Sequence, residues 1–186
     1  RIYIHNYRCF ENLDLVFSDE HSSVLILGKN GTGKSTIGSA LRVLQTIAKG
    51  DNRVRQFLKR DDFAFRQDGS PVRIELTVEL RGKKYDYSIA FELPEGFKEP
   101  RIRDESLSLD GETIYSRKDA QVEITSSDTR FLVDWHLVAL PVVQIRGQHN
   151  PIEELRSWLS RLVLIAPAPE QMSGESEEDS LYPDKR

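Results

Sequence analysis

The chain has 186 residues, of which 38% are hydrophobic and 30% are charged, and its formal net charge is −4. This balance is that of a globular domain that can bury a core. It does not favour a dedicated non-specific DNA-binding protein, which is usually basic, although DNA stays open as a partner. The single cysteine, Cys9, excludes an internal disulfide, and no apolar run reaches the ~18 residues of a membrane span. We therefore expect a cytoplasmic protein without a membrane partner.

The N-terminal residues predict three short strands separated by turns. A β-prone run at residues 2–4 precedes a turn at Asn6-Tyr7-Arg8, and alternating apolar residues from Leu13 to Phe17 predict a second strand. The compact apolar run from Ser22 to Leu27 predicts a third strand, which we expect to be buried.

A helix and an antiparallel sheet are expected next. Apolar residues at helical spacing from Ile37 to Ala48 form one stripe, which predicts an amphipathic helix. The period then changes from 3.6 to two, and alternating residues flank turns around Gly82 and Asp110-Gly111. With a shorter strand at Val122–Ile124, residues 72–125 are expected to form an antiparallel meander.

The remaining segments carry weaker patterns. Residues 131–143 are apolar without a decisive period, whereas Asn150-Pro151 has the capping side chain and early proline of a helix start. Leu162–Ile165 is a candidate strand. Trp135 and Trp158 lie in apolar stretches, so we expect both in the core.

One motif carries chemistry, and it follows the expected third strand: Gly28-Lys29-Asn30-Gly31-Thr32-Gly33-Lys34-Ser35. The spacing G-x-x-x-x-G-K-[S/T] is that of a P-loop, in which glycines let backbone N–H groups wrap around phosphates. Lys34 is expected to reach the β- and γ-phosphates as the catalytic lysine, and Ser35 to ligate Mg²⁺. Thr36 is expected to support the α-phosphate side. The predicted cofactors are ATP and Mg²⁺, and the loop ligands are Gly28, Asn30, Gly31, Thr32, Gly33, Lys34, Ser35 and Thr36.

The loop and the opening residues together resemble a known family. Gly28–Thr36, the opening Ile2–Phe10 with its Asn-Tyr-Arg turn, and the meander through Glu105–Gly111 are similar to RecF/SMC-like ATPase heads of the ABC type. The resemblance implies an α/β fold, with a P-loop NTPase core beside an antiparallel β-subdomain. It also implies that Arg8 approaches the bound phosphates.

The resemblance divides the chain and suggests its partners. Residues 1–168 are expected to form the N-terminal lobe of a head, and residues 169–186 an acidic flexible tail or loop. Heads of this family sandwich ATP between two copies, so a homodimer or higher oligomer is expected. The resemblance further implies a DNA-related or anti-phage role through an effector such as a nuclease or toxin.

A complete head needs three parts that the sequence does not provide clearly. For the glutamine that links Mg²⁺ to the other subdomain, Gln144 is a candidate, with Gln67 and Gln148 as alternatives. Asp134 ends an apolar run but lacks the following glutamate of a Walker B strand, and Met172–Glu175 has too few residues after it to be the signature motif. We therefore expect these 186 residues to bind ATP without efficient hydrolysis.

Other functions are weighed against this one. A non-hydrolysing nucleotide-binding interaction module has the same loop. A transporter ATP-binding subunit would carry its signature near residue 135, and a kinase would follow the loop with helices and an arginine-rich lid. A GTPase would show an Asn-Lys-x-Asp motif, which does not occur. The basic residues within 53–66 are interpreted as a solvated surface rather than a DNA contact, and the scattered histidines show no metal-ligand spacing.

Overall fold

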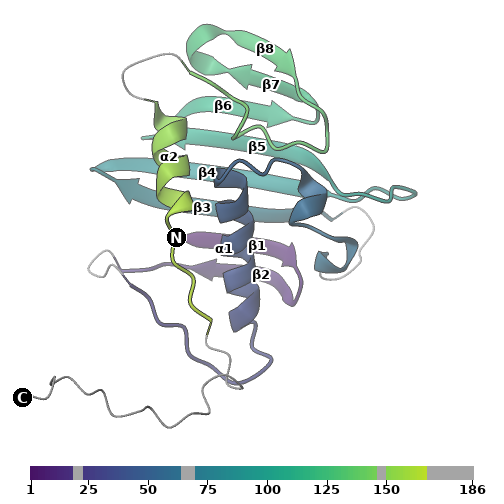
Figure 1. The fold of residues 1–186 in the computed structure, drawn as a ribbon, viewed down its shortest axis with the longest axis vertical. Coiled ribbons are helices and arrows are strands. Elements are labelled where there is room, and N and C mark those ends of the chain that lie inside the picture. Colours follow the sequence, from purple (N-terminus) through teal and green to yellow (C-terminus); the bar gives the residue numbers. More distant parts are fainter. Residues whose placement is uncertain (19–22, 64–69, 146–149, 167–186) are drawn as a thin grey trace, which may run out of the picture.

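The computed structural model describes residues 1–18, 23–63, 70–145 and 150–166 (Figure 1). These residues form one eight-stranded antiparallel sheet and two α-helices. The strands are β1 (Ile2–Tyr7), β2 (Phe10–Leu15), β3 (Val72–Leu80), β4 (Lys83–Glu92), β5 (Arg101–Leu109), β6 (Glu112–Lys118), β7 (Gln121–Ile124) and β8 (Thr129–Leu132). The helices are α1 (Lys34–Ala48) and α2 (Pro151–Ser160), and single 3-10 turns lie at Val54–Gln56, Arg60–Asp62 and Thr125–Ser127.

The strand order follows the chain except at one place. From β3 to β8 each strand pairs with the next, which confirms the predicted meander, whereas the β1–β2 hairpin joins the sheet through β1 and β3. Residues on the covered face lie in register from strand to strand. One such row is Ile4, Ile74, Ile89, Glu105, Arg117, Val122 and Phe131.

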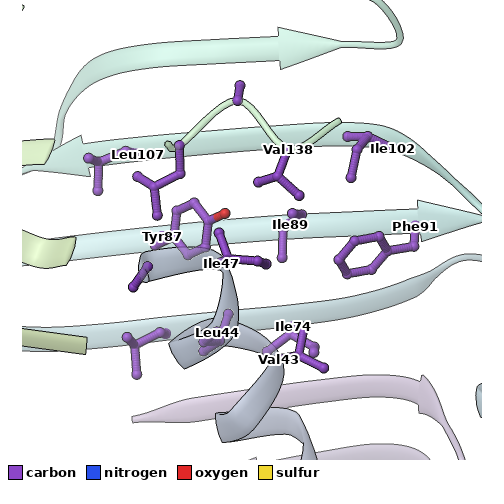
Figure 2. Close-up of a cluster of buried hydrophobic side chains, with 14 of the residues drawn as sticks. Val43, Leu44, Ile47, Ile74, Tyr87, Ile89, Phe91, Ile102, Leu107 and Val138 are labelled. Carbon is purple, nitrogen blue, oxygen red and sulfur yellow. The ribbon is translucent and has the colours of Figure 1, made fainter. Parts of the chain in front are cut away.

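The core lies between this face of the sheet and the two helices. In Figure 2, Val43, Leu44 and Ile47 of α1 lie over side chains of β3, β4 and β5, and Val138 covers the same face beside β5. The labelled side chains of the sheet in this view are Ile74, Tyr87, Ile89, Phe91, Ile102 and Leu107. Because the apolar positions of α1 recur at helical spacing and those of the strands at a spacing of two, each element has one dry face, and these faces meet.

The two helices are tied to each other by polar contacts. The side-chain amide of Gln45 in α1 donates to the carbonyl of Leu162 at 2.6 Å, just after α2 ends. The guanidinium of Arg156 in α2 donates to the carbonyl of Ala48 at 3.3 Å, at the C-terminus of α1. In α2, Asn150 caps the first turn as predicted, because its side-chain oxygen accepts from the backbone N–H groups of Ile152 and Glu153. Neither helix has the length and apolar character of a membrane span in the described part of the chain.

A buried polar cluster joins the centre of the sheet to residues 134–140. Glu105 is 1% exposed and accepts hydrogen bonds from the hydroxyls of Tyr87 and Tyr115, and from the backbone N–H groups of Ala139 and Leu140. Arg117, 2% exposed, donates to backbone carbonyls of Asp119, Leu137 and Asp134. The segment that had no decisive period therefore starts within β8, at residues 131 and 132, and forms no helix or further strand after it. Its later residues are held by these polar contacts and by the burial of Val138, Ala139 and Leu140.

Three expectations about apolar residues were wrong. The predicted strand Ser22–Leu27 is not a strand at residues 23–27, where Leu25 and Leu27 are each 80% exposed; Ser22 lies outside the described residues. The predicted strand Leu162–Ile165 is also absent, and Ile165 is 83% exposed. A buried strand of this kind needs neighbouring strands on both sides, and no described residues pair with either segment.

The third wrong expectation concerns a tryptophan. Trp135 is 42% exposed, and its ring lies 4.3 Å from the guanidinium carbon of Arg101 in a cation–π contact. An indole can stay partly exposed when a cation covers its face. Trp158, in contrast, is partly buried and packs against the core.

Candidate nucleotide-binding site

The motif loop leads directly into α1, which begins at Lys34. Gly31 and Gly33 have positive φ angles of 84° and 89°, in the left-handed region that glycine adopts without steric cost. Gly33 is the N-cap residue of α1. The first backbone N–H groups of α1, which have no acceptor within the helix, therefore point toward the loop. The helix thus begins three residues before its first expected apolar position.

Most of the predicted ligands surround one hollow at this helix N-terminus. A cavity of ≈ 280 Å³ is lined by Cys9, Asn30, Gly31, Gly33, Lys34, Ser35 and Thr36. Six of the nine residues predicted for the site are therefore brought together, and Gly28, Thr32 and Arg8 do not line the cavity. A larger surface hollow of ≈ 480 Å³ lies elsewhere, between the β3–β4 turn and α2, and holds no residue of the motif.

Lys34 lies over the loop that precedes it. Its ammonium donates to the carbonyls of Gly28 and Lys29, each at 2.6 Å. The hydroxyl of Thr32 donates to the same Lys29 carbonyl at 2.9 Å. Gly28 and Thr32 therefore shape the loop in this structure, whereas Lys34 places a cation at the cavity where an anion would be stabilised.

Arg8 is held beside the site by two neighbours. Its backbone φ is 53°, and its guanidinium donates to Asp62 at 2.8 Å through Nε and to the hydroxyl of Ser39 at 2.8 Å through Nη1. Ser39 in turn donates to the carbonyl of Ser35 at 2.9 Å. Arg8 is thus linked through the Ser39 side chain to the backbone carbonyl of Ser35, not to the Ser35 hydroxyl that is the predicted metal ligand, and it does not line the cavity.

Asp62 also affects Tyr7, the residue before Arg8. Tyr7 is 1% exposed, and burial, followed by the charge of Asp62, raises the pKa of its hydroxyl to about 12. Tyr7 therefore stays neutral at physiological pH, and its ring lies 5.2 Å from the guanidinium carbon of Arg8. The turn after β1 is consequently held by packing, by charge and by a cation–π contact.

Cys9 was not among the predicted site residues. Its thiol is exposed and lies 3.4 Å from the hydroxyl of Thr36, and the residue forms part of the cavity wall. The signal for this position was its place directly after the Asn-Tyr-Arg turn. A turn brings neighbouring residues together but does not show what it packs against, so its contact with the loop could not be read from the sequence.

The parts of a complete ATPase head are not assembled in the described residues. Gln144 has an exposed side chain and does not line the cavity, while Gln67, Gln148 and Met172–Glu175 lie outside the described residues. Asp134, which was considered for the Walker B strand, accepts a hydrogen bond from the backbone N–H of His136 at 2.8 Å. This hydrogen bond is the largest cause of the lowered pKa of its carboxyl group. Within the described ranges there is no group of three histidine, cysteine or acidic side chains placed to hold a metal ion.

Comparison with known proteins identifies the family. A family model described as an AAA domain matches residues 1–162, which is most of the chain. The chain belongs to this family. A curated relative, the DNA double-strand break repair Rad50 ATPase of Thermoplasma volcanium, is 32% identical over 89 residues. That match covers 45% of this chain and 10% of the relative, so the chain spans only a small part of the relative's length.

The family match and the relative confirm the resemblance found in the sequence. This chain corresponds to the N-terminal part of a RecF/SMC-like AAA ATPase head. Of the expected fold class, the mixed α/β character and the antiparallel sheet are confirmed. The P-loop core and the division at residue 168 stay predictions, since residues 167–186 lie outside the described part.

Proposed function

We propose that the chain binds the phosphates of ATP, together with Mg²⁺, in the cavity at the N-terminus of α1. The supporting observation is the convergence of loop glycines, Lys34 and Ser35 on one hollow at a helix N-terminus. Such an end attracts anions through its N–H groups and its partial positive charge. The cavity, of ≈ 280 Å³, has room for phosphate groups.

The chemistry of the donors fits this ligand. Lys34 would neutralise phosphate charge, and the hydroxyl of Ser35 would ligate Mg²⁺, which when bound neutralises charge on the phosphate oxygens. Thr36 would donate to the α-phosphate side. Arg8, now bonded to Ser39 and Asp62, would approach the phosphates by exchanging the Ser39 hydroxyl for a phosphate oxygen.

The wider role we propose is that of an ATPase head which dimerises around ATP. Membership of the AAA domain family and the similarity to Rad50, whose name refers to DNA double-strand break repair, support this role. In the whole protein, ATP binding would join two heads and hydrolysis would release them, so that the cycle regulates a DNA-related or anti-phage activity of an effector such as a nuclease or toxin. The protein would act in the cytoplasm.

A non-hydrolysing nucleotide-binding module is the second candidate. One observation favours it for this chain: none of the described residues that line the cavity is a carboxylate. An ATPase head of the expected type needs a glutamate that orients the attacking water, and Lys34 and Ser35 cannot take that role. Dimerisation around ATP without turnover would still make the chain a switch.

Nucleotide titration of two loop variants tests the proposal. Lys34→Ala should weaken binding of a fluorescent ATP analogue about ten- to a hundredfold, because a charge-assisted contact of roughly 1.5–3 kcal/mol is lost. Ser35→Ala should remove the dependence of binding on Mg²⁺. Lys49→Ala is the matched control, since Lys49 is an exposed lysine just after the other end of α1. Equal affinities for wild type and Lys34→Ala would contradict the proposal.

A further inference from the structure

The turn between β1 and β2 lies directly on the phosphate loop. The thiol of Cys9 is 3.4 Å from the hydroxyl of Thr36, in the first turn of α1. A methyl group placed on Gly33 would lie 2.3 Å from Cζ and 2.8 Å from Cε1 of the Phe10 ring, and 3.0 Å from the sulfur of Cys9. The edge of the ring therefore packs against the backbone of the residue that caps the helix.

The contact between Phe10 and Gly33 leaves little room for movement. Contacts below 3.0 Å to a Cβ are essentially never observed, so the ring occupies the space that any side chain at position 33 would need. Gly33 also has a φ of 89°, which a residue with a Cβ rarely adopts. Both the conformation of the loop and its contact with the ring thus depend on glycine at this point.

A second contact from the same turn reaches the next helical turn. Arg8 donates to the hydroxyl of Ser39, and Ser39 lies three residues after Thr36 and six after Gly33. Residues spaced by three and four share one face of a helix. Arg8 and Cys9 of the β1–β2 turn and Phe10 at the start of β2 thus contact one face of the N-terminal half of α1, and Phe10 lies against its N-cap residue.

We propose that Phe10 is a positioning residue for the phosphate loop. Its ring fixes the backbone at Gly33, and through it the direction of the N–H groups that open into the cavity. The ring itself does not line the cavity, so it acts through the loop rather than on the ligand. Binding sites whose first contacts are held rigid by a second layer lose affinity when that layer is loosened. The inference rests on the proposed binding of nucleotide phosphates.

Two substitutions alter the ring in opposite ways. Phe10→Ala leaves a gap against Gly33, and Phe10→Tyr adds an oxygen at Cζ, the ring atom nearest to Gly33. Both should weaken binding of the fluorescent ATP analogue, Phe10→Ala by about tenfold, because loop positions shift on the scale that pre-organised sites resolve. Leu13→Ala is the matched control, since Leu13 is also a partly buried apolar residue of β2, and it pairs with Ile4.

A second readout uses the only cysteine in the chain. Cys9 is exposed and lines the cavity, so bound nucleotide should protect its thiol from iodoacetamide. In the Phe10 variants, half-protection should need a higher nucleotide concentration than in the wild type, at temperatures well below each variant's melting point. Leu13→Ala should lower the melting temperature while leaving affinity and protection unchanged.

The outcomes separate this inference from the function on which it rests. If the wild type binds in a Lys34-dependent way and both Phe10 variants bind within about twofold of it, Phe10 has no positioning role and the proposed function stands. If Leu13→Ala weakens binding as much as Phe10→Ala, the effect is general destabilisation and the inference is overturned. If Phe10→Ala does not fold, Phe10→Tyr decides. Absence of binding by the wild type would overturn both proposals.

Discussion

Glu105 shows how a single residue can order several segments at once. Its carboxylate is buried in a row of mostly apolar side chains and accepts from two tyrosine hydroxyls and two backbone N–H groups. All four partners are donors, so only a group that accepts on both oxygens satisfies them. The two backbone donors belong to Ala139 and Leu140. Their hydrogen bonds to Glu105 connect the sheet to the segment that leads to Gln144.

Glu105→Gln should therefore destabilise the fold by about 1–3 kcal/mol, because the amide NH₂ would face a donor and leave buried groups unpaired. Urea denaturation at neutral pH would measure this loss. Glu112→Gln is the control, since Glu112 is an exposed glutamate on the adjacent strand and should have little effect. A loss below about 0.5 kcal/mol would contradict the role given to Glu105.

The same variant should change how stability depends on pH. Burial raises the pKa of Glu105 above its ordinary 4.5, so the folded chain holds this proton more tightly than the unfolded chain. The part of the free energy of unfolding that is linked to this proton is full below pH 4.5 and is lost as the pH rises through the folded-state pKa. This part is separate from the four hydrogen bonds that the carboxylate accepts. Glu105→Gln cannot titrate, so the difference between wild type and variant should vary with pH in this window.

At the scale of elements, the start of α2 was predicted from the sequence and is confirmed. Asn150 caps it, Pro151 is its first residue, and its apolar side packs on the core. Asn150→Ala should lower the free energy of unfolding by about 1 kcal/mol, since two backbone N–H groups lose their acceptor. Asn150→Asp keeps an acceptor and should stay near the wild type. Equal urea midpoints for all three proteins would show that the cap contributes nothing.

Elements whose partners are close in the chain were the ones predictable from sequence. The meander follows from alternation and from turns such as Asp110-Gly111, because each strand pairs with the next. The register also follows, since a shift of one residue would turn the apolar face of β4 to water. In the site, the glycine and lysine spacing predicted six of the residues that line the cavity.

Features that depend on distant partners were not predictable. Residues 23–27 have the composition of a buried strand, but an apolar run does not specify which strands will flank it. The contact of the β1–β2 turn with α1 joins residues more than twenty positions apart, and no local pattern records it. Arg8 was expected at the phosphates, whereas its position depends on Asp62, from a segment whose pattern predicted only a solvated surface.

For the whole molecule, the composition of the cavity wall predicts its enzymatic behaviour. The 186 residues should bind ATP and show negligible hydrolysis, because the cavity holds a cation and hydroxyls but no described carboxylate. Phosphate release measured over hours, with Lys34→Ala as the blank, checks this. A robust rate that Lys34→Ala abolishes would mean that the chain supplies its own catalytic acid.

The strand order also bears on how the chain folds. Strands β3 to β8 assemble by closing short loops, whereas β1 meets β3 through residues 70 positions apart, such as Ile4 and Ile74. Closing a long loop costs more entropy and is slower than forming neighbouring hairpins. The phosphate loop and α1 lie inside that long loop, so the meander is expected to form first and the site to be completed last. A complete chain that refolds from denaturant would therefore hold a largely formed sheet before it could respond to nucleotide.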